Sequence, residues 1–205
     1  MATATEQRAS RRRRRDEARG AVLRAALELA EGTPFKDLTV DEIARAAGVS
    51  RTAFYIHFRD KGELLLAAVD EVAAELHEQA DRWWSGEGEP TELVREALAG
   101  VVGVYAEHAR LLRLATEVST YDEEVRAFWL ELMGRFITTA TAQIRSEQEA
   151  GRIDPSLDPE ATAEAMVWMT ERYCYIYLTR EPRTPETVTA SLGAVWTAAL
   201  YGAPS

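Results

Sequence analysis

The segment "GVSRTAFYIHFRDKGE", residues 48–63, gathers side chains that can form hydrogen bonds with another molecule. If it is helical, the 3.6-residue period points Phe54 and Phe58 inward. A cation, a hydroxyl and a phenol then share another side of the helix: Arg51, Thr52 and Tyr55. Such groups suit the edges of bases in the DNA major groove and the phosphates beside them.

Two short helices must position this face. The spacing of one set of small and apolar residues is that of two short helices that cross at a turn: Ile43, Ala44, Ala47, Gly48, Val49 and Phe54. Thr39 and Glu42 have the spacing of a capping box, which starts the first helix. Gly48 suits the left-handed turn that ends it. The sequence therefore predicts a helix-turn-helix.

The longer run "TVDEIARAAGVSRTAFYIHFRDKGELL" resembles the DNA-binding signature of the TetR family. The order of the aromatic residues, the turn glycine and the downstream lysine all agree with that signature. The resemblance implies a regulator of transcription that binds double-stranded DNA, with Arg51, Thr52 and Ala53 at the base-reading positions and Lys61 on a phosphate. The implied DNA-contacting residues are Thr39, Ser50, Arg51, Thr52, Ala53, Tyr55, His57 and Lys61. Considered singly, Tyr55 is more often a half-buried structural tyrosine, and His57 a surface histidine with its hydrogen bonds made.

A second basic feature precedes this segment. Five adjacent arginines, Arg11 to Arg15, repel one another, so we expect residues 1–15 to form a disordered arm in the free protein. Beside DNA, the arm would follow phosphates or enter a minor groove through Arg13, Arg14 and Arg15. The alternative is a solvated tail with little role.

The chain as a whole reads as all-α, because alanine, leucine, glutamate and arginine dominate while prolines and glycines fall between periodic segments. Two further helix starts are clear: Asp158 before Pro159, and Thr184 before Pro185. We expect about nine helices, near residues 16–31, 40–47, 51–57, 61–84, 91–108, 109–117, 122–150, 158–179 and 185–200. The predicted units are the arm at 1–15, a DNA-binding domain at 16–61 and a larger effector-binding and dimerisation domain at 62–205.

The formal net charge of −10 is unevenly distributed along the 205 residues. Residues 1–61 hold 13 Lys and Arg against 9 Asp and Glu, whereas residues 62–205 hold 11 against 25. Only the N-terminal part is therefore suited to approach a polyanion.

The large domain carries two helices with unusual apolar faces. One stripe contains Phe128, Trp129, Leu132, Met133, Phe136 and Ala140, and the other contains Met166, Trp168, Met169, Tyr173, Tyr175 and Tyr177. Such side chains line an adaptable cavity or fill an ordinary core. The stretches "MVWMTERYCYIYL" and "VWTAALYG" also resemble actinobacterial repressors of the ethionamide-resistance type, which hold long apolar ligands. The candidate pocket residues are Tyr105, Trp129, Met133, Phe136, Ala140, Met166, Thr170, Glu171 and Tyr175.

Glu171 is the one acidic residue among these candidates. Set between apolar neighbours, it either anchors a ligand amide or hydroxyl, or forms a salt bridge with Arg172 or with an arginine across a helix interface. The repressor of the ethionamide-resistance type carries Asn at the position of Thr170, so a hydrogen bond made there would differ in this chain.

The resemblance further implies a homodimer joined through the last two helices, a palindromic operator, and a small, largely apolar effector that releases the repressor from it. A different possibility is a constitutive DNA-binding dimer whose large domain only dimerises or docks a protein partner.

Other function classes find little support. The three histidines, His57, His77 and His108, lie apart and form no metal-binding spacing, and the sequence lacks a nucleophile elbow, a phosphate loop and a dinucleotide fingerprint. We expect neither catalysis nor a cofactor or metal. The lone Cys174, the lack of a secretory signal and the absence of long apolar runs predict a cytoplasmic protein that does not contact membranes.

Overall fold

The computed structural model describes residues 4–85, 88–181 and 183–202, and every regular element in those ranges is helical. The elements are α1 (Ala4–Leu29), η1 (a 3₁₀ turn, Phe35–Asp37), α2 (Val40–Ala46), α3 (Arg51–His57), α4 (Lys61–Ser85), α5 (Pro90–Glu107), α6 (Ala109–Val118), α7 (Glu123–Glu149), α8 (Pro159–Cys174), η2 (a π-helical segment, Tyr175–Arg180) and α9 (Pro185–Tyr201). The all-α prediction is confirmed.

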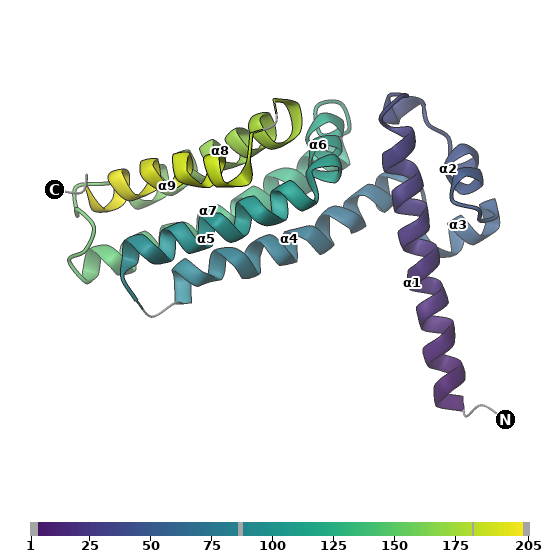
Figure 1. The fold of residues 1–205 in the computed structure, drawn as a ribbon, viewed down its shortest axis with the longest axis horizontal. Coiled ribbons are helices and arrows are strands. Elements are labelled where there is room, and N and C mark those ends of the chain that lie inside the picture. The colour runs from purple at the N-terminus through teal and green to yellow at the C-terminus, as the bar shows by residue number, and fades with distance from the viewer. Residues whose placement is uncertain (1–3, 86–87, 182, 203–205) are drawn as a thin grey trace.

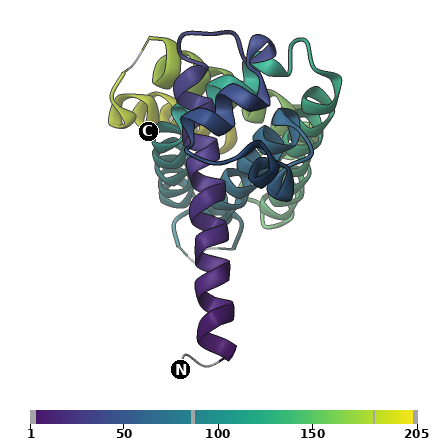
Figure 2. The same cartoon turned by 90° about the vertical axis from the view of Figure 1, so that its right-hand side faces the viewer.

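Two parts are visible in the ribbon (Figure 1). The head consists of α1, α2 and α3, and the body is an elongated bundle of α4 to α9. Seen along the length of the bundle, α1 crosses in front of it, and its N-terminal half extends beyond the other helices (Figure 2). Because α4 contacts both α1 and the body helices α5 and α7, it connects the two parts.

The predicted helix starts have the expected chemistry. Thr39 Oγ1 accepts a hydrogen bond from Glu42 N at 3.2 Å, and Thr39 N donates to Glu42 Oε2 at 2.8 Å, which completes the capping box. Asp158 and Thr184 cap α8 and α9, each with proline at the first helical position. Each of these caps satisfies backbone N–H groups that the helix leaves free.

The structure corrects the predicted start of α1. The helix begins at Ala4, so residues 4–15, predicted as a disordered arm, continue it. This segment contains no glycine or proline, and alanine, glutamate, glutamine and arginine favour a helix. The side chains of Arg14 and Arg15 lie outside the described part of the structure.

A second difference concerns the predicted helix at 158–179. The α-helix ends at Cys174, and η2 follows as wider turns in which Glu181 N donates to Ile176 O, five residues back, at 2.8 Å. The hydroxyl of Thr179 donates to Tyr175 O at 2.5 Å and so competes for a carbonyl of the helical ladder. The periodicity of the sequence does not distinguish π from α turns.

One continuous hydrophobic core runs through head and body. In the body, α5 packs against α4 and α9, α7 packs against α8, and α8 touches α9. Figure 1 shows α8 and α9 along one outer edge of the bundle. Among the described residues, no helix combines the length and apolar character needed to cross a membrane.

Candidate nucleic-acid interface and internal cavity

The helix-turn-helix rests on an apolar layer between α2 and α3. Phe54 and Phe58 are buried as predicted, as is Ile43. Gly48 adopts a φ of 69°, a left-handed conformation that glycine accepts readily. Val49 N then donates to Ala44 O at 3.0 Å, which closes the turn. The chain therefore presents α3 with one side fixed against the core.

The outer side of α3 is available to another molecule. Tyr55 is 46% exposed, and Arg51 and Thr52 are exposed as well, whereas Ala53 and His57 are half-buried. Arg51 donates to Asp41 Oδ2 at 3.1 Å and to the Tyr55 hydroxyl at 3.4 Å. These contacts hold the guanidinium beside the phenol. Ser50 and Thr39 are exposed too, but their side chains cap α3 and α2.

Ile56 is an exposed residue on α3 that the sequence predictions omitted. Its side chain is 65% exposed, the highest value among the exposed large hydrophobic residues of the described chain. Its position between Tyr55 and His57 in the sequence could have indicated that it lies on this face. An apolar side chain there suits the methyl group of thymine.

In the free protein, Lys61 makes contacts within the chain, and the phosphate contact implied by the resemblance stays a prediction. Its ammonium donates to the carbonyl oxygens of Phe35 at 2.6 Å, Lys36 at 2.6 Å and Leu38 at 2.7 Å. An ammonium has three N–H donors, so none remains for a phosphate. Burial lowers the pKa of Lys61, and the negative charges of Asp37 and Glu42 partly oppose this shift. These contacts connect η1 to the start of α4.

The N-terminal arginines lie far along α1 from the α2–α3 turn (Figure 1). The described side chain among them, Arg13, is exposed and pairs with Glu17 at 3.4 Å. An exposed pair of this kind contributes little to stability, so it does not prevent Arg13 from pairing with a phosphate instead.

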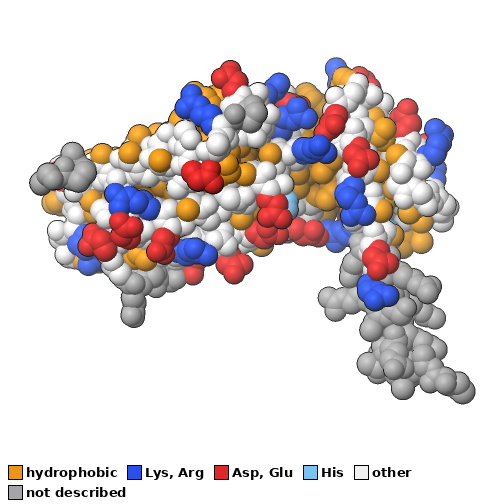
Figure 3. All heavy atoms as spheres, in the orientation of Figure 1, with side chains coloured by type: hydrophobic (Ala, Val, Ile, Leu, Met, Phe, Trp, Pro, Cys, Tyr) orange, Lys and Arg blue, Asp and Glu red, His pale blue; other side chains and the backbone are white. Residues whose placement is uncertain are grey.

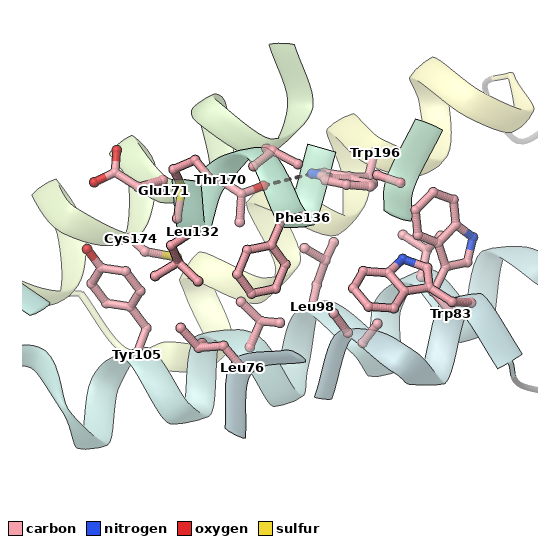
Figure 4. Close-up of a pocket in the computed structure, with 18 of the residues that line it drawn as sticks. Leu76, Trp83, Leu98, Tyr105, Leu132, Phe136, Thr170, Glu171, Cys174 and Trp196 are labelled. Atoms are coloured by element: carbon pink, nitrogen blue, oxygen red, sulfur yellow. Dashed lines mark hydrogen bonds between the residues drawn. The ribbon is translucent and has the colours of Figure 1, made fainter. Parts of the chain in front are cut away.

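The body contains a cavity of about 110 Å³ lined by residues of α4, α5, α6, α7, α8 and α9 (Figure 4). Seven of the nine candidate pocket residues line it: Tyr105, Trp129, Met133, Phe136, Ala140, Thr170 and Glu171. Met166 is buried elsewhere in the core. Tyr175 opens η2 outside the cavity, where its hydroxyl accepts a hydrogen bond from Arg180 Nε at 3.1 Å.

Most of the remaining wall comes from helices in which the sequence predictions named few or no pocket residues. From α4 come Leu76, Ala80, Trp83 and Trp84, from α5 Val94, Ala97, Leu98 and Val101, from α6 Leu112, and from α7 to α9 Leu132, Val167, Cys174 and Trp196. The two adjacent tryptophans of α4, Trp83 and Trp84, could have indicated from the sequence that this helix lines a cavity. The aliphatic residues have the ordinary pattern of a helical core.

Two polar side chains, Tyr105 and Glu171, lie at one end of this cavity (Figure 4). Tyr105 and Glu171 are 4% and 6% exposed, and within the described part of the chain neither the Tyr105 hydroxyl nor the Glu171 carboxylate has a hydrogen-bond partner. Burial raises the pKa of Glu171, which the charge of Arg172 partly opposes. Burial also raises the pKa of Tyr105, and the nearby Glu171 charge adds to that effect. Thr170 differs, because its hydroxyl accepts a hydrogen bond from Trp196 Nε1 at 3.0 Å.

Comparison with known proteins agrees with both parts of the molecule. Residues 22–68 match the model of bacterial regulatory proteins of the tetR family, and residues 94–202 match the C-terminal domain of the transcriptional regulator EthR. The HTH-type transcriptional regulator EthR of Mycolicibacterium smegmatis is 29% identical over 210 residues, covering 98% of this chain and 97% of the relative. EthR of Mycobacterium tuberculosis is 29% identical over 190 residues, covering 89% and 86%.

Solved structures show the same fold. A TetR-family regulator from Syntrophomonas wolfei has a TM-score of 0.76 at 15% identity, over 89% of this chain and 94% of that one. NalD, the secondary repressor of the MexAB-OprM multidrug efflux pump in Pseudomonas aeruginosa, has a TM-score of 0.73 at 21% identity, over 91% and 98%. A helix-turn-helix in the head and an EthR-type match over more than half of the chain lead to one conclusion: the protein belongs to the TetR family of DNA-binding transcriptional regulators and is not an enzyme.

Proposed function

We propose that the protein is a dimeric repressor that a small, largely apolar effector releases from a palindromic operator. The observation that carries this proposal is the internal cavity of about 110 Å³, which lies in the body, apart from the exposed face of α3. Separate sites for DNA and effector are what allosteric control requires. The division into a DNA-binding domain at 16–61 and an effector domain at 62–205 is part of the same proposal, with residues 4–15 as the N-terminal part of α1.

The proposed DNA contacts follow the exposed side of the head. Arg51, Thr52 and Ala53 would meet base edges, while Tyr55 and His57 would meet phosphates or bases. Supporting this assignment, Arg51 and Tyr55 lie together on the exposed side of α3. The basic run of α1 would add contacts to the DNA backbone through Arg13, Arg14 and Arg15.

The proposed dimer forms through α8 and α9. Small apolar side chains are exposed along these helices: Ala161, Ala165, Ala190, Ala194, Val195, Ala198 and Ala199. In the space-filling view, uncharged surface predominates over α9 along the upper-left edge (Figure 3). Pairing this edge with a second copy would bury it in a four-helix bundle. Two α3 helices would then read half-sites about 34 Å apart.

The proposed release acts through α4. This helix lines the cavity with Trp83 and Trp84 near its C-terminal end, and Lys61 at its first residue holds η1. An effector that requires a wider cavity would displace α4, and with it the head. Because such an effector binds one conformation better, it shifts the population away from the spacing that fits DNA.

Selection of bound DNA from a random duplex pool, at about 150 mM salt where exposed charges are substantially screened, tests the DNA half of the proposal. We expect an enriched palindrome, which then serves as the probe in a release assay with apolar compounds. A folded protein that enriches no sequence would contradict the proposal. Enrichment without release by any cavity-sized apolar compound would instead favour a constitutive DNA-binding dimer.

A further inference from the structure

Three buried oxygen atoms at one end of the cavity have no hydrogen-bond partner among the described residues: the Tyr105 hydroxyl and both carboxylate oxygens of Glu171. Both residues are more than nine-tenths buried, and both line the cavity (Figure 4). Buried polar groups in folded proteins nearly always have partners. A carboxylate left unpaired in apolar surroundings is especially costly. The arrangement therefore points to a ligand group that completes it.

Arg172 is close to this carboxylate but does not satisfy it. Its Nε lies 3.7 Å from Glu171 Oε2, an ion-pair distance but too long for a hydrogen bond. The Arg172 guanidinium is exposed and lies over the Tyr175 ring, with Cζ 5.0 Å from the ring centroid. The salt bridge considered from the sequence is therefore present, but it leaves both carboxylate oxygens without a donor.

A group that donates hydrogen bonds would complete these oxygens, and a positive charge on it would favour the ionised form of Glu171 against the effect of burial. A primary ammonium has three donors and no acceptor, which suits three acceptor oxygens. A hydroxyl supplies one donor, and a carboxylate would be repelled by Glu171. The chain itself contains the corresponding geometry at Lys61, whose ammonium donates to three oxygens at 2.6 to 2.7 Å.

We propose that the effector is an amphipathic amine whose ammonium binds Glu171 and Tyr105, while its alkyl or aryl part lies against Phe136, Trp129 and Trp83. This inference rests on the proposed function, since it specifies the chemistry of the effector. The apolar walls of the cavity select the hydrocarbon, and the two polar residues at its end select the charge.

The test compares three ligands with one hydrocarbon chain and different head groups: octylammonium, octanol and octanoate. Binding is measured by calorimetry and by the rise in melting temperature of the full chain. Glu171→Gln removes the charge at constant volume, and Tyr105→Phe removes only the hydroxyl. Glu164→Gln is the matched control, because it makes the same charge change at an exposed position of the same helix.

We expect the unaltered protein and Glu164→Gln to prefer octylammonium over octanol by about tenfold or more, and Glu171→Gln to abolish that preference. Octanol binding should change by no more than about twofold in any variant, which also shows that the variants are folded. Equal binding of octylammonium and octanol, or a preference for octanoate, would overturn the ammonium assignment and leave the apolar effector site intact. If no octyl compound binds or raises the melting temperature, the effector site itself fails along with the inference.

Discussion

At the scale of single residues, Tyr55 and Lys61 separate two roles that the sequence motif alone does not distinguish. Tyr55 is exposed beside Arg51, whereas the Lys61 ammonium is occupied by three backbone carbonyls. The resemblance assigned both to DNA. A motif records which residue types occur together, and only the hydrogen bonds show whether a cation is still free to bind a phosphate.

Tyr55→Phe is expected to weaken binding to the selected operator by about 1 kcal/mol, because it removes one hydroxyl from the DNA-facing side of α3. The denaturation midpoint should change little, since Tyr55 is exposed and its hydroxyl bonds only weakly, at 3.4 Å, to the exposed Arg51. A fluorescence-anisotropy titration with labelled duplex measures the loss. Tyr177→Phe, which removes a hydroxyl from η2 in the body, is the control. If the two variants bind operator equally well, Tyr55 does not contact DNA.

Lys61→Ala is expected to lower the free energy of unfolding by about 1–3 kcal/mol, because three backbone carbonyls lose a charged donor. The salt dependence of DNA binding should stay unchanged. A lysine on a phosphate would instead reduce the slope of log K against log salt by about 0.9. Urea denaturation and salt titrations give the two readouts. Lys36→Ala, at the exposed second lysine, is the stability control.

At the scale of the elements, local signals predicted most of the fold. Caps at Thr39, Asp158 and Thr184 located three helix starts, because each supplies a specific acceptor for free N–H groups. The π segment η2 was missed because the periodicity of apolar residues does not distinguish π turns from α turns. The α4 and α5 walls of the cavity were largely missed for another reason: aliphatic side chains have the same helical pattern whether they face a core or a cavity.

Thr39→Ala is expected to destabilise the protein by about 1 kcal/mol, since it removes the N-cap acceptor of α2. Thr39→Ser keeps the hydroxyl and should recover most of that stability. Urea denaturation followed by circular dichroism measures both. An equal loss in the two variants would mean that the Thr39 methyl group, and not the cap, stabilises this end of α2.

At the scale of the whole molecule, the proposed dimer accounts for apolar surface left exposed at the α8–α9 edge. Ala194→Glu places a charge among the exposed alanines of α9, and we expect it to convert the dimer to a monomer. Analytical ultracentrifugation checks the oligomeric state. Ala127→Glu makes the same change at an exposed position of α7. A dimer that persists in Ala194→Glu and dissociates in Ala127→Glu would place the interface on α7.

The cavity also contains four of the five tryptophans of the chain, Trp83, Trp84, Trp129 and Trp196. Intrinsic emission from this protein therefore comes mainly from indoles that any occupant would touch. A bound molecule should change the emission spectrum without an added label, so the protein acts as its own optical sensor of occupancy.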